Sequence, residues 1–210
     1  MKYYIVGAGG FGREVRAWVM QTPKFASSYS FGGFLDENPE ATARFGTHLP
    51  VVGSPATHVP EPDAVYFMGI GNPSVRLRIG RELMARGANF PVLYHPAAIV
   101  GADCSVGTGS ILCPGVVLTA NVVIGEFVLL NLYATVGHDA CIGDGATVSC
   151  HADVTGYAEV GSCAFLSSHA SVIPSAKVGE RAVVGAGSVV LRSVKPGATV
   201  VGVPAKQISP

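Results

Sequence analysis

An uninterrupted six-residue repeat over residues 100–190 limits the fold of this chain more than any other feature. In each hexad one position is aliphatic, and the position two residues before it is small or valine. Helices bury side chains at a period of about 3.6 and strands at a period of about 2, so neither accounts for a period of six. Stacked coils account for it, because short strands about 4.8 Å apart can point aliphatic side chains inward and place small residues at the corners. The repeat therefore predicts a parallel β-helix of roughly five coils of about 18 residues each. The aliphatic positions are Val100, Val106, Leu112, Leu118, Ile124, Leu130, Val136, Ile142, Val148, Val154, Val160, Leu166, Val172, Val178, Val184 and Val190.

The first 95 residues alternate predicted strands and helices, which favours a small parallel sheet flanked by helices. The first strand leads into a glycine-rich turn, GAGGFG at residues 7–12, and then into a helix. A short amphipathic helix follows the strand at 64–70 and ends at a glycine. We expect strands over 3–6, 30–35, 51–53, 64–70 and 90–94, and helices over 13–20 and 74–86.

The glycine-rich turn indicates a nucleotide-linked ligand. Glycines at this spacing let a phosphate approach the backbone N–H groups at a helix N-terminus. Asp36 and Glu37 end the second strand, about 20 residues further on, where an acidic group can hold a ribose hydroxyl. The second half of a dinucleotide-binding fold is missing, so a nucleotide diphosphate is favoured over NAD. The alternative, in which the glycines serve only close packing of strand and helix, stays open.

Two groups of residues depart from the uniform hexads. His138 and Asp139 should point outward near a corner, where the carboxylate would make the imidazole a better general base. The alternative is a solvated pair without a role. His151 and His169 are one coil apart and should stack on one face, with Tyr133 a coil earlier. They could form a zinc site, although lining a subunit surface or a cofactor groove is the simpler interpretation.

Composition excludes several classes of function. The 210-residue chain has a formal net charge of zero, which argues against nucleic-acid and membrane partners. No apolar run reaches the roughly 20 residues of a membrane span, and the first residues do not resemble a signal peptide. The five cysteines all lie in the repeat without a CxxC pair, so we expect reduced thiols, no metal and a cytoplasmic protein. The chain is 49% hydrophobic and only 13% charged, which favours burial of surface by self-association.

Seven motifs occur in order along the chain: GAGGFGREV (7–15), GFLDEN (33–38), IGNPSVR (70–76), HPAAIVG (95–101), NLYATVGHDACIGDGATV (131–148), GAGSVV (185–190) and VVGVPAK (200–206). Their set and order resemble those of the bacterial sugar O-acyltransferase family, and the resemblance covers essentially the whole chain. Members of that family include sialic-acid O-acetyltransferases and nucleotide-amino-sugar N-acetyltransferases.

The resemblance implies two domains and an assembly. Residues 1–95 would form a Rossmann-like domain that binds a nucleotide-sugar. Residues 96–210 would form a left-handed β-helix acyltransferase domain with a C-terminal cap. The protein would be a homotrimer with acetyl-CoA in the groove between neighbouring β-helices, and no metal is expected.

The resemblance also assigns site residues, matched one position at a time. The catalytic base would be His138, tuned by Asp139. The substrate contacts would be Gly9, Gly10, Phe11, Asp36, Glu37, Gly71 and Asn131. The coenzyme A contacts would be Thr147, Ser168, Gly185, Ala186 and Gly187, with Thr147 at a position where some relatives carry a histidine.

The resulting hypothesis is an acetyl-CoA-dependent N-acetyltransferase of surface-glycan biosynthesis. It would act on the amino group of a nucleotide-linked amino-deoxy sugar by direct transfer, with His138 as general base. A cysteine acyl-enzyme is disfavoured, because Cys141 and Cys150 have no paired base to lower their pKa. The alternatives are a sugar O-acetyltransferase of the sialic-acid type, a non-catalytic nucleotide-sugar-binding protein and an NAD binder.

Overall fold

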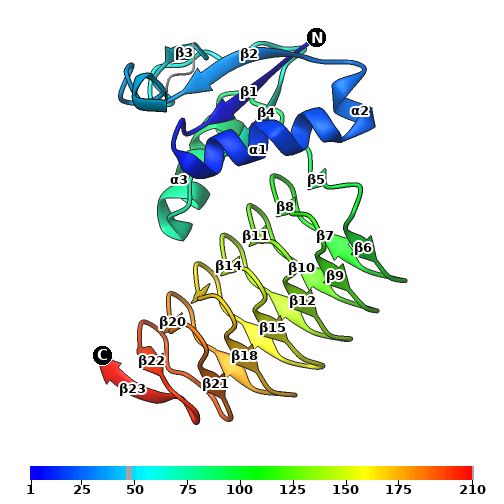
Figure 1. The fold of residues 1–210 in the computed structure, drawn as a ribbon, viewed down its shortest axis with the longest axis vertical. Helices are drawn as coiled ribbons and strands as arrows, with labels where there is room; N and C mark the ends of the chain where they lie inside the picture. Colours follow the sequence, from blue (N-terminus) through cyan, green and yellow to red (C-terminus); the bar gives the residue numbers. More distant parts are fainter. Residues whose placement is uncertain (46–48, 210) are drawn as a thin grey trace.

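An α/β domain is followed by a β-helix in the computed structural model, which describes residues 1–45 and 49–209. The α/β domain stands over the first coils, and the chain then winds away from it, so that the two termini lie at opposite ends (Figure 1). The fold class predicted from the six-residue repeat and the βα alternation is confirmed. None of the helices in the described residues is long and apolar enough to span a membrane.

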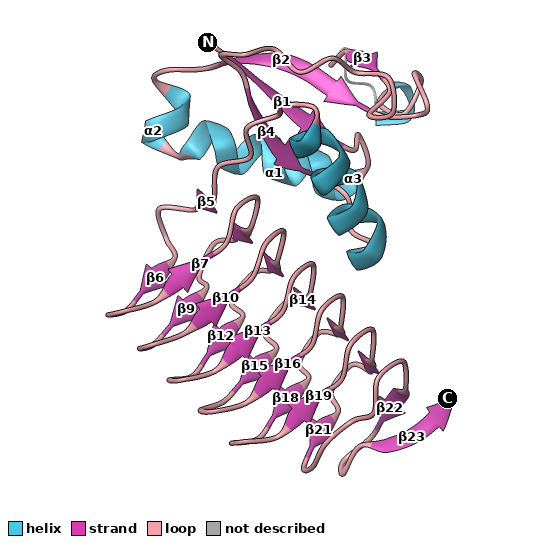
Figure 2. Ribbon diagram, turned by 180° about the vertical axis from the view of Figure 1, so that it is seen from behind, coloured by secondary structure: helices cyan, strands magenta, loops and turns pink. Residues whose placement is uncertain are grey.

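The α/β domain is built on a parallel sheet with the strand order β3-β2-β1-β4. The central strands are buried on both faces, which explains their continuous apolar sequences, such as YYIV in β1. Figure 2 shows α3 extending from the sheet toward the β-helix. The elements are β1 (Lys2–Val6), α1 (Gly10–Gln21), α2 (Pro23–Ala26), β2 (Ser30–Leu35), a 3-10 turn (Ala43–Phe45), β3 (Val51–Gly53), β4 (Val65–Met68) and α3 (Pro73–Ala85).

Three sheets form the β-helix, and from β5 to β21 their parallel strands follow one another in strict rotation along the chain. Each strand pairs with the strand one coil on, so that Val123 lies between Ser105 and Cys141. The strands are β5 (Leu93–Tyr94), β6 (Ile99–Val100), β7 (Ser105–Val106), β8 (Ile111–Leu112), β9 (Val117–Leu118), β10 (Val123–Ile124), β11 (Leu129–Leu130), β12 (Thr135–Val136), β13 (Cys141–Ile142), β14 (Thr147–Val148), β15 (Asp153–Val154), β16 (Glu159–Val160), β17 (Phe165–Leu166), β18 (Ser171–Val172), β19 (Lys177–Val178), β20 (Val183–Val184), β21 (Val189–Val190), β22 (Thr199–Val201) and β23 (Lys206–Ser209).

The corners of the coils hold non-glycine residues in the left-handed backbone region. Asp139 has φ 59° and Tyr157 has the same value one coil on. Such a conformation costs about 1–2 kcal/mol per residue, so something must hold it in place. The backbone ladder does so, because the N–H of Asp139 donates to the carbonyl of Ala120 at 3.0 Å and that of Tyr157 to the carbonyl of His138 at 2.9 Å. Corner residues are therefore held rigidly by the coil before them.

The strand predicted over residues 90–94 is shorter and belongs to the second domain. Only Leu93–Tyr94 forms a strand, β5, and it pairs with β8 as the first strand of the β-helix. Phe90 is instead a buried side chain at the domain junction, where its ring contacts those of Tyr66 and Phe127 at centroid distances of 5.7 and 5.2 Å. The apolar run in the sequence thus reflects packing between domains.

The C-terminal residues depart from the hexads and return along the last coil. Strand β22 continues the parallel stack beyond β20, and β23 then returns antiparallel along β22. The reversal gives the last coil a partner strand, which reduces the unpaired edge that a repeat fold leaves at its end.

The two domains are joined through Arg76, which lies on α3 and has 1% of its surface exposed. Helix α3 begins at Pro73 because Asn72 caps it, with the N–H of Val75 donating to Asn72 Oδ1 at 3.0 Å. The Arg76 guanidinium then donates to the carbonyl of Phe127 at 2.9 Å, and to the carbonyl and hydroxyl groups of the neighbouring coil at 2.8–3.1 Å. Burial lowers the pKa of Arg76 to about 10, which leaves it protonated at neutral pH.

The junction is close because Gly80 has no side chain. A Cβ at Gly80 would lie 2.5 Å from the Phe127 ring, so the helix approaches the coil nearer than any other residue would allow. Arg81, one position on, forms ion pairs with Glu126 at 3.1 Å and Asp144 at 2.7 Å at the rim of the same contact. Helix α3 therefore clamps the α/β domain onto one corner of the β-helix.

Replacing Arg76 by alanine should lower the free energy of unfolding by at least about 3 kcal/mol, because several buried carbonyl groups would lose their donor at about 1–3 kcal/mol each. Urea titration of the two proteins measures the difference. The matched control is Arg78→Ala on the same helix, whose exposed pair with Glu82 is worth about 0.3–0.5 kcal/mol. Equal losses in the two variants would contradict the role given to Arg76.

Candidate functional site

His138 and Asp139 form a hydrogen-bonded pair at the corner between β12 and β13. The Nδ1 atom of His138 donates to Asp139 Oδ2 at 2.9 Å, and the two side chains are 57% and 33% exposed. Because the carboxylate of Asp139 accepts a hydrogen bond from Nδ1, the proton of the neutral imidazole is on Nδ1. The other ring nitrogen, Nε2, then carries the lone pair. The pair is thus an exposed base oriented by a carboxylate.

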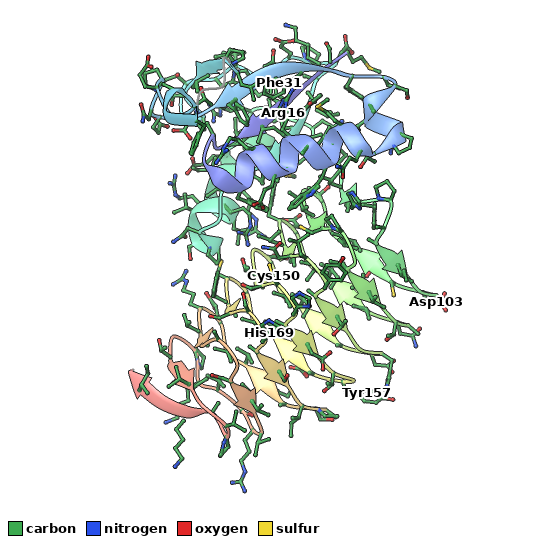
Figure 3. All side chains as sticks on the ribbon, in the orientation of Figure 1. Arg16, Phe31, Asp103, Cys150, Tyr157 and His169 are labelled. Atoms are coloured by element: carbon green, nitrogen blue, oxygen red, sulfur yellow. The ribbon has the colours of Figure 1, made fainter. Side chains whose placement is uncertain are left out.

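Two residues that the sequence interpretation missed complete this corner, which we call the His138 edge (Asp103, Asn121, His138, Asp139, Gly156, Tyr157). Asn121, one coil earlier, donates from Nδ2 to Asp139 Oδ1 at 3.2 Å. Tyr157, one coil later, meets the His138 ring edge-on at a centroid distance of 5.0 Å. The coil length could have revealed both residues, because Asn121 is 18 residues before Asp139 and Tyr157 is 18 residues after it. Figure 3 shows Asp103 and Tyr157 along this edge of the β-helix.

The electrostatics of the His138 edge favour an ionised carboxylate. The hydrogen bond from His138 lowers the pKa of Asp139 most, and hydrogen bonds from Asn121 and Tyr157 lower it further. An ionised Asp139 stabilises a positive charge on the imidazole beside it. The arrangement suits a base that gains a proton during a reaction.

A second corner, the His169 edge (Tyr133, His151, His169, Gly187), carries the column expected from the 18-residue spacing. The rings of Tyr133 and His151 stack with centroids 5.1 Å apart, and those of His151 and His169 with centroids 4.9 Å apart. The ring planes differ by only 7° and 5°. Among the described residues, no three His, Cys, Asp or Glu side chains lie close enough to hold a metal ion.

The predicted coenzyme A contacts gather at the His169 edge, with one exception. Ser168, Gly185, Ala186 and Gly187 lie in successive coils there, and the N–H of Gly187 donates to the carbonyl of Ser168 at 3.0 Å. Asn131 lies on the same edge, where its Oδ1 accepts from the N–H of Leu132 at 2.8 Å. Within one chain, Asn131 and His138 therefore stand at different corners.

Thr147 is the exception, because its side chain lies at the contact with α3. It is 2% exposed, and its hydroxyl accepts a hydrogen bond from Arg76 at 2.8 Å. Within one chain the Thr147 side chain is therefore occupied by Arg76, and its contact with coenzyme A stays a prediction. The sequence could not reveal this, because Arg76 is 71 residues away along the chain.

In the α/β domain, Gly9 and Asp36 line one cavity of about 280 Å³, together with Asn38, Glu40 and Ala41. The carboxylate of Asp36 accepts from the N–H of Ala8 at 2.8 Å and from that of Asn38 at 2.9 Å. Asp36 therefore ties the glycine turn to the loop after β2, and the two predicted ligand segments form one wall.

The glycines of the turn divide into two kinds. A Cβ at Gly12 would lie 2.0 Å from the carbonyl oxygen of Gly7, so this glycine serves packing of helix against strand. Gly9 has open space around it, and Gly10 has its nearest neighbour, the Arg13 side chain, at 3.9 Å. The packing alternative thus holds for Gly12, whereas Gly9 and Gly10 face free space.

The other predicted substrate contacts are dispersed. Phe11 is half-buried, with its ring edge-on to Trp18 at 6.0 Å. Glu37 accepts a hydrogen bond from the Ser54 hydroxyl at 2.7 Å. Gly71 lines a separate hollow of about 420 Å³ between α3 and the coils, which also includes Arg181. The structure therefore joins Gly9 and Asp36 in one cavity and leaves these three outside it.

The glycine turn and the His138 edge lie on different sides of the chain. Helix α1 begins at the left of the α/β domain in Figure 1, whereas Tyr157 lies on the right of the β-helix in Figure 3, which has the same orientation. A ligand held by the turn of one chain therefore does not lie beside His138 of that chain.

Comparison with known proteins places this geometry in a family. Residues 2–83 match the family model described as the PglD N-terminal domain. A curated relative, GDP-perosamine N-acetyltransferase of Escherichia coli O157:H7, is 28% identical over 137 residues, which span 65% of this chain and 62% of that protein. The acetyltransferase domain of PglB from Neisseria gonorrhoeae FA1090, solved with acetyl coenzyme A, is 28% identical with a TM-score of 0.89, over 99% of this chain and 98% of that one. PerB from Caulobacter crescentus, solved with CoA and GDP-perosamine, is 28% identical with a TM-score of 0.85, over 100% and 98%.

The chain belongs to the sugar acyltransferase family. The resemblance seen in the sequence motifs is thereby confirmed. As in that family, the β-helix is left-handed, and the structural matches extend over both domains of this sugar acyltransferase.

In this sugar acyltransferase, the pKa of Asp139 should rise when either hydrogen-bond donor is removed. The rise should be larger in His138→Ala than in Asn121→Ala, because the bond from His138 has the greater effect. NMR titration of the Asp139 carboxyl carbon measures both variants. The control is Glu61 in the α/β domain, whose pKa is lowered by hydrogen bonds from Tyr4 and Lys2 and should be the same in all three proteins. A pKa of Asp139 that is unchanged in both variants would contradict the hydrogen-bonded arrangement.

Proposed function

We propose that this protein is an acetyl-CoA-dependent N-acetyltransferase that acts on the amino group of a nucleotide-linked amino-deoxy sugar. The observation that carries the proposal is the His138–Asp139 pair on a chain that aligns over its full length with PerB bound to CoA and GDP-perosamine. The name of the curated relative, GDP-perosamine N-acetyltransferase, supports transfer to nitrogen over transfer to oxygen. We also propose a cytoplasmic location, which the five free cysteines support because a reducing compartment keeps thiols unpaired.

In the proposed reaction, the sugar amine attacks the thioester carbonyl of acetyl-CoA while His138 accepts a proton from the amine at Nε2. The C–N bond forms, the C–S bond breaks, and the sulfur leaves as CoA thiolate, which takes up the proton. Asp139 holds the ring through Nδ1 and stabilises the imidazolium. A backbone N–H in the groove would stabilise the oxyanion of the tetrahedral intermediate.

The nucleotide would bind at the cavity formed by Gly9 and Asp36. Backbone N–H groups at the start of α1 suit a diphosphate, and Gly9 and Gly10 leave room for it to approach. Coenzyme A would run along the His169 edge past Ser168 and Gly187. In this arrangement each ligand uses a different part of the fold.

A homotrimer would bring these parts together. The glycine turn and the His138 edge are separated within one chain, so a site shared between subunits explains how one substrate reaches both. Exposed apolar side chains on the β-helix, such as Val123 at 49% and Tyr133 at 57%, are consistent with a surface that subunits cover. Asn131 of one subunit would then complete the site at His138 of the next.

Replacing His138 by alanine should lower kcat by about 10² to 10⁴ while leaving the affinity for coenzyme A unchanged, because general-base help is worth that much and the ring does not bind the co-substrate. A thiol-release assay with GDP- and UDP-linked amino sugars measures the rate, and calorimetry measures the affinity. Asp103→Ala, on the same edge, is the control and should keep the wild-type rate. Near-normal turnover of the His138 variant would overturn the assignment.

The wild-type rate should rise with pH while the base loses its proton, since only a neutral imidazole can accept a proton from the amine. Asp139, with its lowered pKa, is already ionised there and adds no further step. A pH-rate profile that is flat from about pH 5 to 8 would contradict a histidine base.

Mixing two inactive variants should restore activity if the site is shared between subunits. His138→Ala removes the base, and Gly9→Asp places a carboxylate where the diphosphate would bind. Refolded together in equal amounts, they should recover about a quarter of the wild-type activity, because one site in four combines an intact turn with an intact histidine. Each variant refolded alone is the control. No recovery from a mixed trimer, verified by light scattering, would show that each chain holds a complete site.

A further inference from the structure

The His138 ring lies against a glycine one coil further along the His138 edge. A Cβ built on Gly156 would be 2.7 Å from His138 Nε2 and 2.8 Å from Cε1. These distances are well inside van der Waals contact, so the imidazole occupies the space that any other side chain at this position would fill.

The backbone does not require glycine at this position. Gly156 has no positive φ, unlike the residue that follows it at the corner. The same position in other coils is held by Ala102, Ala120 and Pro174, which shows that the fold accepts a Cβ there. The neighbouring imidazole, which fills the space of a side chain, therefore explains why residue 156 is a glycine.

The ring cannot turn away from Gly156 without losing its other contacts. Asp139 holds Nδ1 at 2.9 Å on one side, and Tyr157 lies edge-on to the ring at 5.0 Å. The backbone next to Gly156 is fixed as well, because the N–H of Tyr157 donates to the carbonyl of His138 at 2.9 Å. A methyl group at residue 156 would push the ring by several tenths of an ångström and move Nε2, the atom that accepts the proton.

We propose that Gly156 is a positioning residue for the reaction, which provides the space in which the His138 imidazole lies with Nε2 toward the substrate. The inference rests on the proposed function in which His138 is the base. In this role Gly156 acts on the reaction through the position of the His138 ring.

The test is Gly156→Ala, measured alone and combined with His138→Ala. In the otherwise wild-type enzyme, kcat should fall by about tenfold with the KM for acetyl-CoA unchanged, because a misplacement of about 1 Å costs about 10²-fold and the ring moves by less than that. In the His138→Ala background the same substitution should cause no further loss. An equal loss in both backgrounds would show a general structural effect and overturn the proposal.

The ring signals of His138 in an NMR spectrum of the free enzyme give a readout that does not depend on activity. They should shift in Gly156→Ala, and the thermal midpoint should stay within a few degrees of the wild type. Gly53→Ala is the control, because its Cβ would have Leu35 Cδ2 at 4.0 Å as nearest neighbour, and it should change neither rate nor signals.

The two hypotheses fail in different ways. An active wild type with an equally active Gly156→Ala variant would overturn the positioning role and leave the proposed function standing. An inactive wild type, tested across the amino-sugar panel, would overturn the proposed function. In that case, unchanged NMR signals of the His138 ring in Gly156→Ala would also refute the contact between Gly156 and the ring. Shifted signals would support that contact.

Discussion

The hydrogen-bond ladder between successive coils is the constraint on which this protein depends. Each strand pairs with the strand 18 residues away, so a corner side chain has its neighbours at that separation before and after it. Asn121 and Tyr157 meet Asp139 and His138 for this reason, and the stacked rings of the His169 edge follow the same rule. The ladder also holds the left-handed corner conformations that aim these side chains outward. The orientation of the candidate base is thus a property of the stack more than of the local sequence around it.

A second constraint is the burial of one cation between the domains. Arg76 reaches from α3 into a corner of the β-helix, where carbonyl and hydroxyl oxygens accept hydrogen bonds from its guanidinium and stabilise the buried charge. Because α3 covers this corner, the other two corners, the His138 edge and the His169 edge, remain open. The clamp therefore decides which surface of the β-helix is available to ligands and to other subunits, and it removes Thr147 from that surface.

Much of this could be read from residue types and spacing. The six-residue repeat predicted the β-helix and its interior, the period of 18 predicted the column of Tyr133, His151 and His169, and the adjacent His138 and Asp139 predicted an oriented base. What the residue pattern does not reveal lies where the domains meet. Phe90 is outside the strand predicted over 90–94 and packs against Phe127, and the Thr147 hydroxyl accepts a hydrogen bond from Arg76. Phe127 is distant in sequence from Phe90, and Arg76 is distant from Thr147. No local repeat in the sequence links either pair.

The sequence by itself determined the coil, because a repeat of six leaves a chain few other ways to bury one aliphatic side chain in every hexad. It also singled out His138 and Asp139 as candidates, since an imidazole beside a carboxylate is a pairing that suits proton transfer. Only the tertiary structure decided which corner each residue occupies relative to α3, that the glycine turn and His138 lie on different sides of the chain, and that Gly156 makes room for the imidazole. These outcomes depend on how the α/β domain docks on the β-helix and on contacts between coils. The six-residue repeat permits many such arrangements, and side-chain volume and hydrogen-bond geometry select one of them.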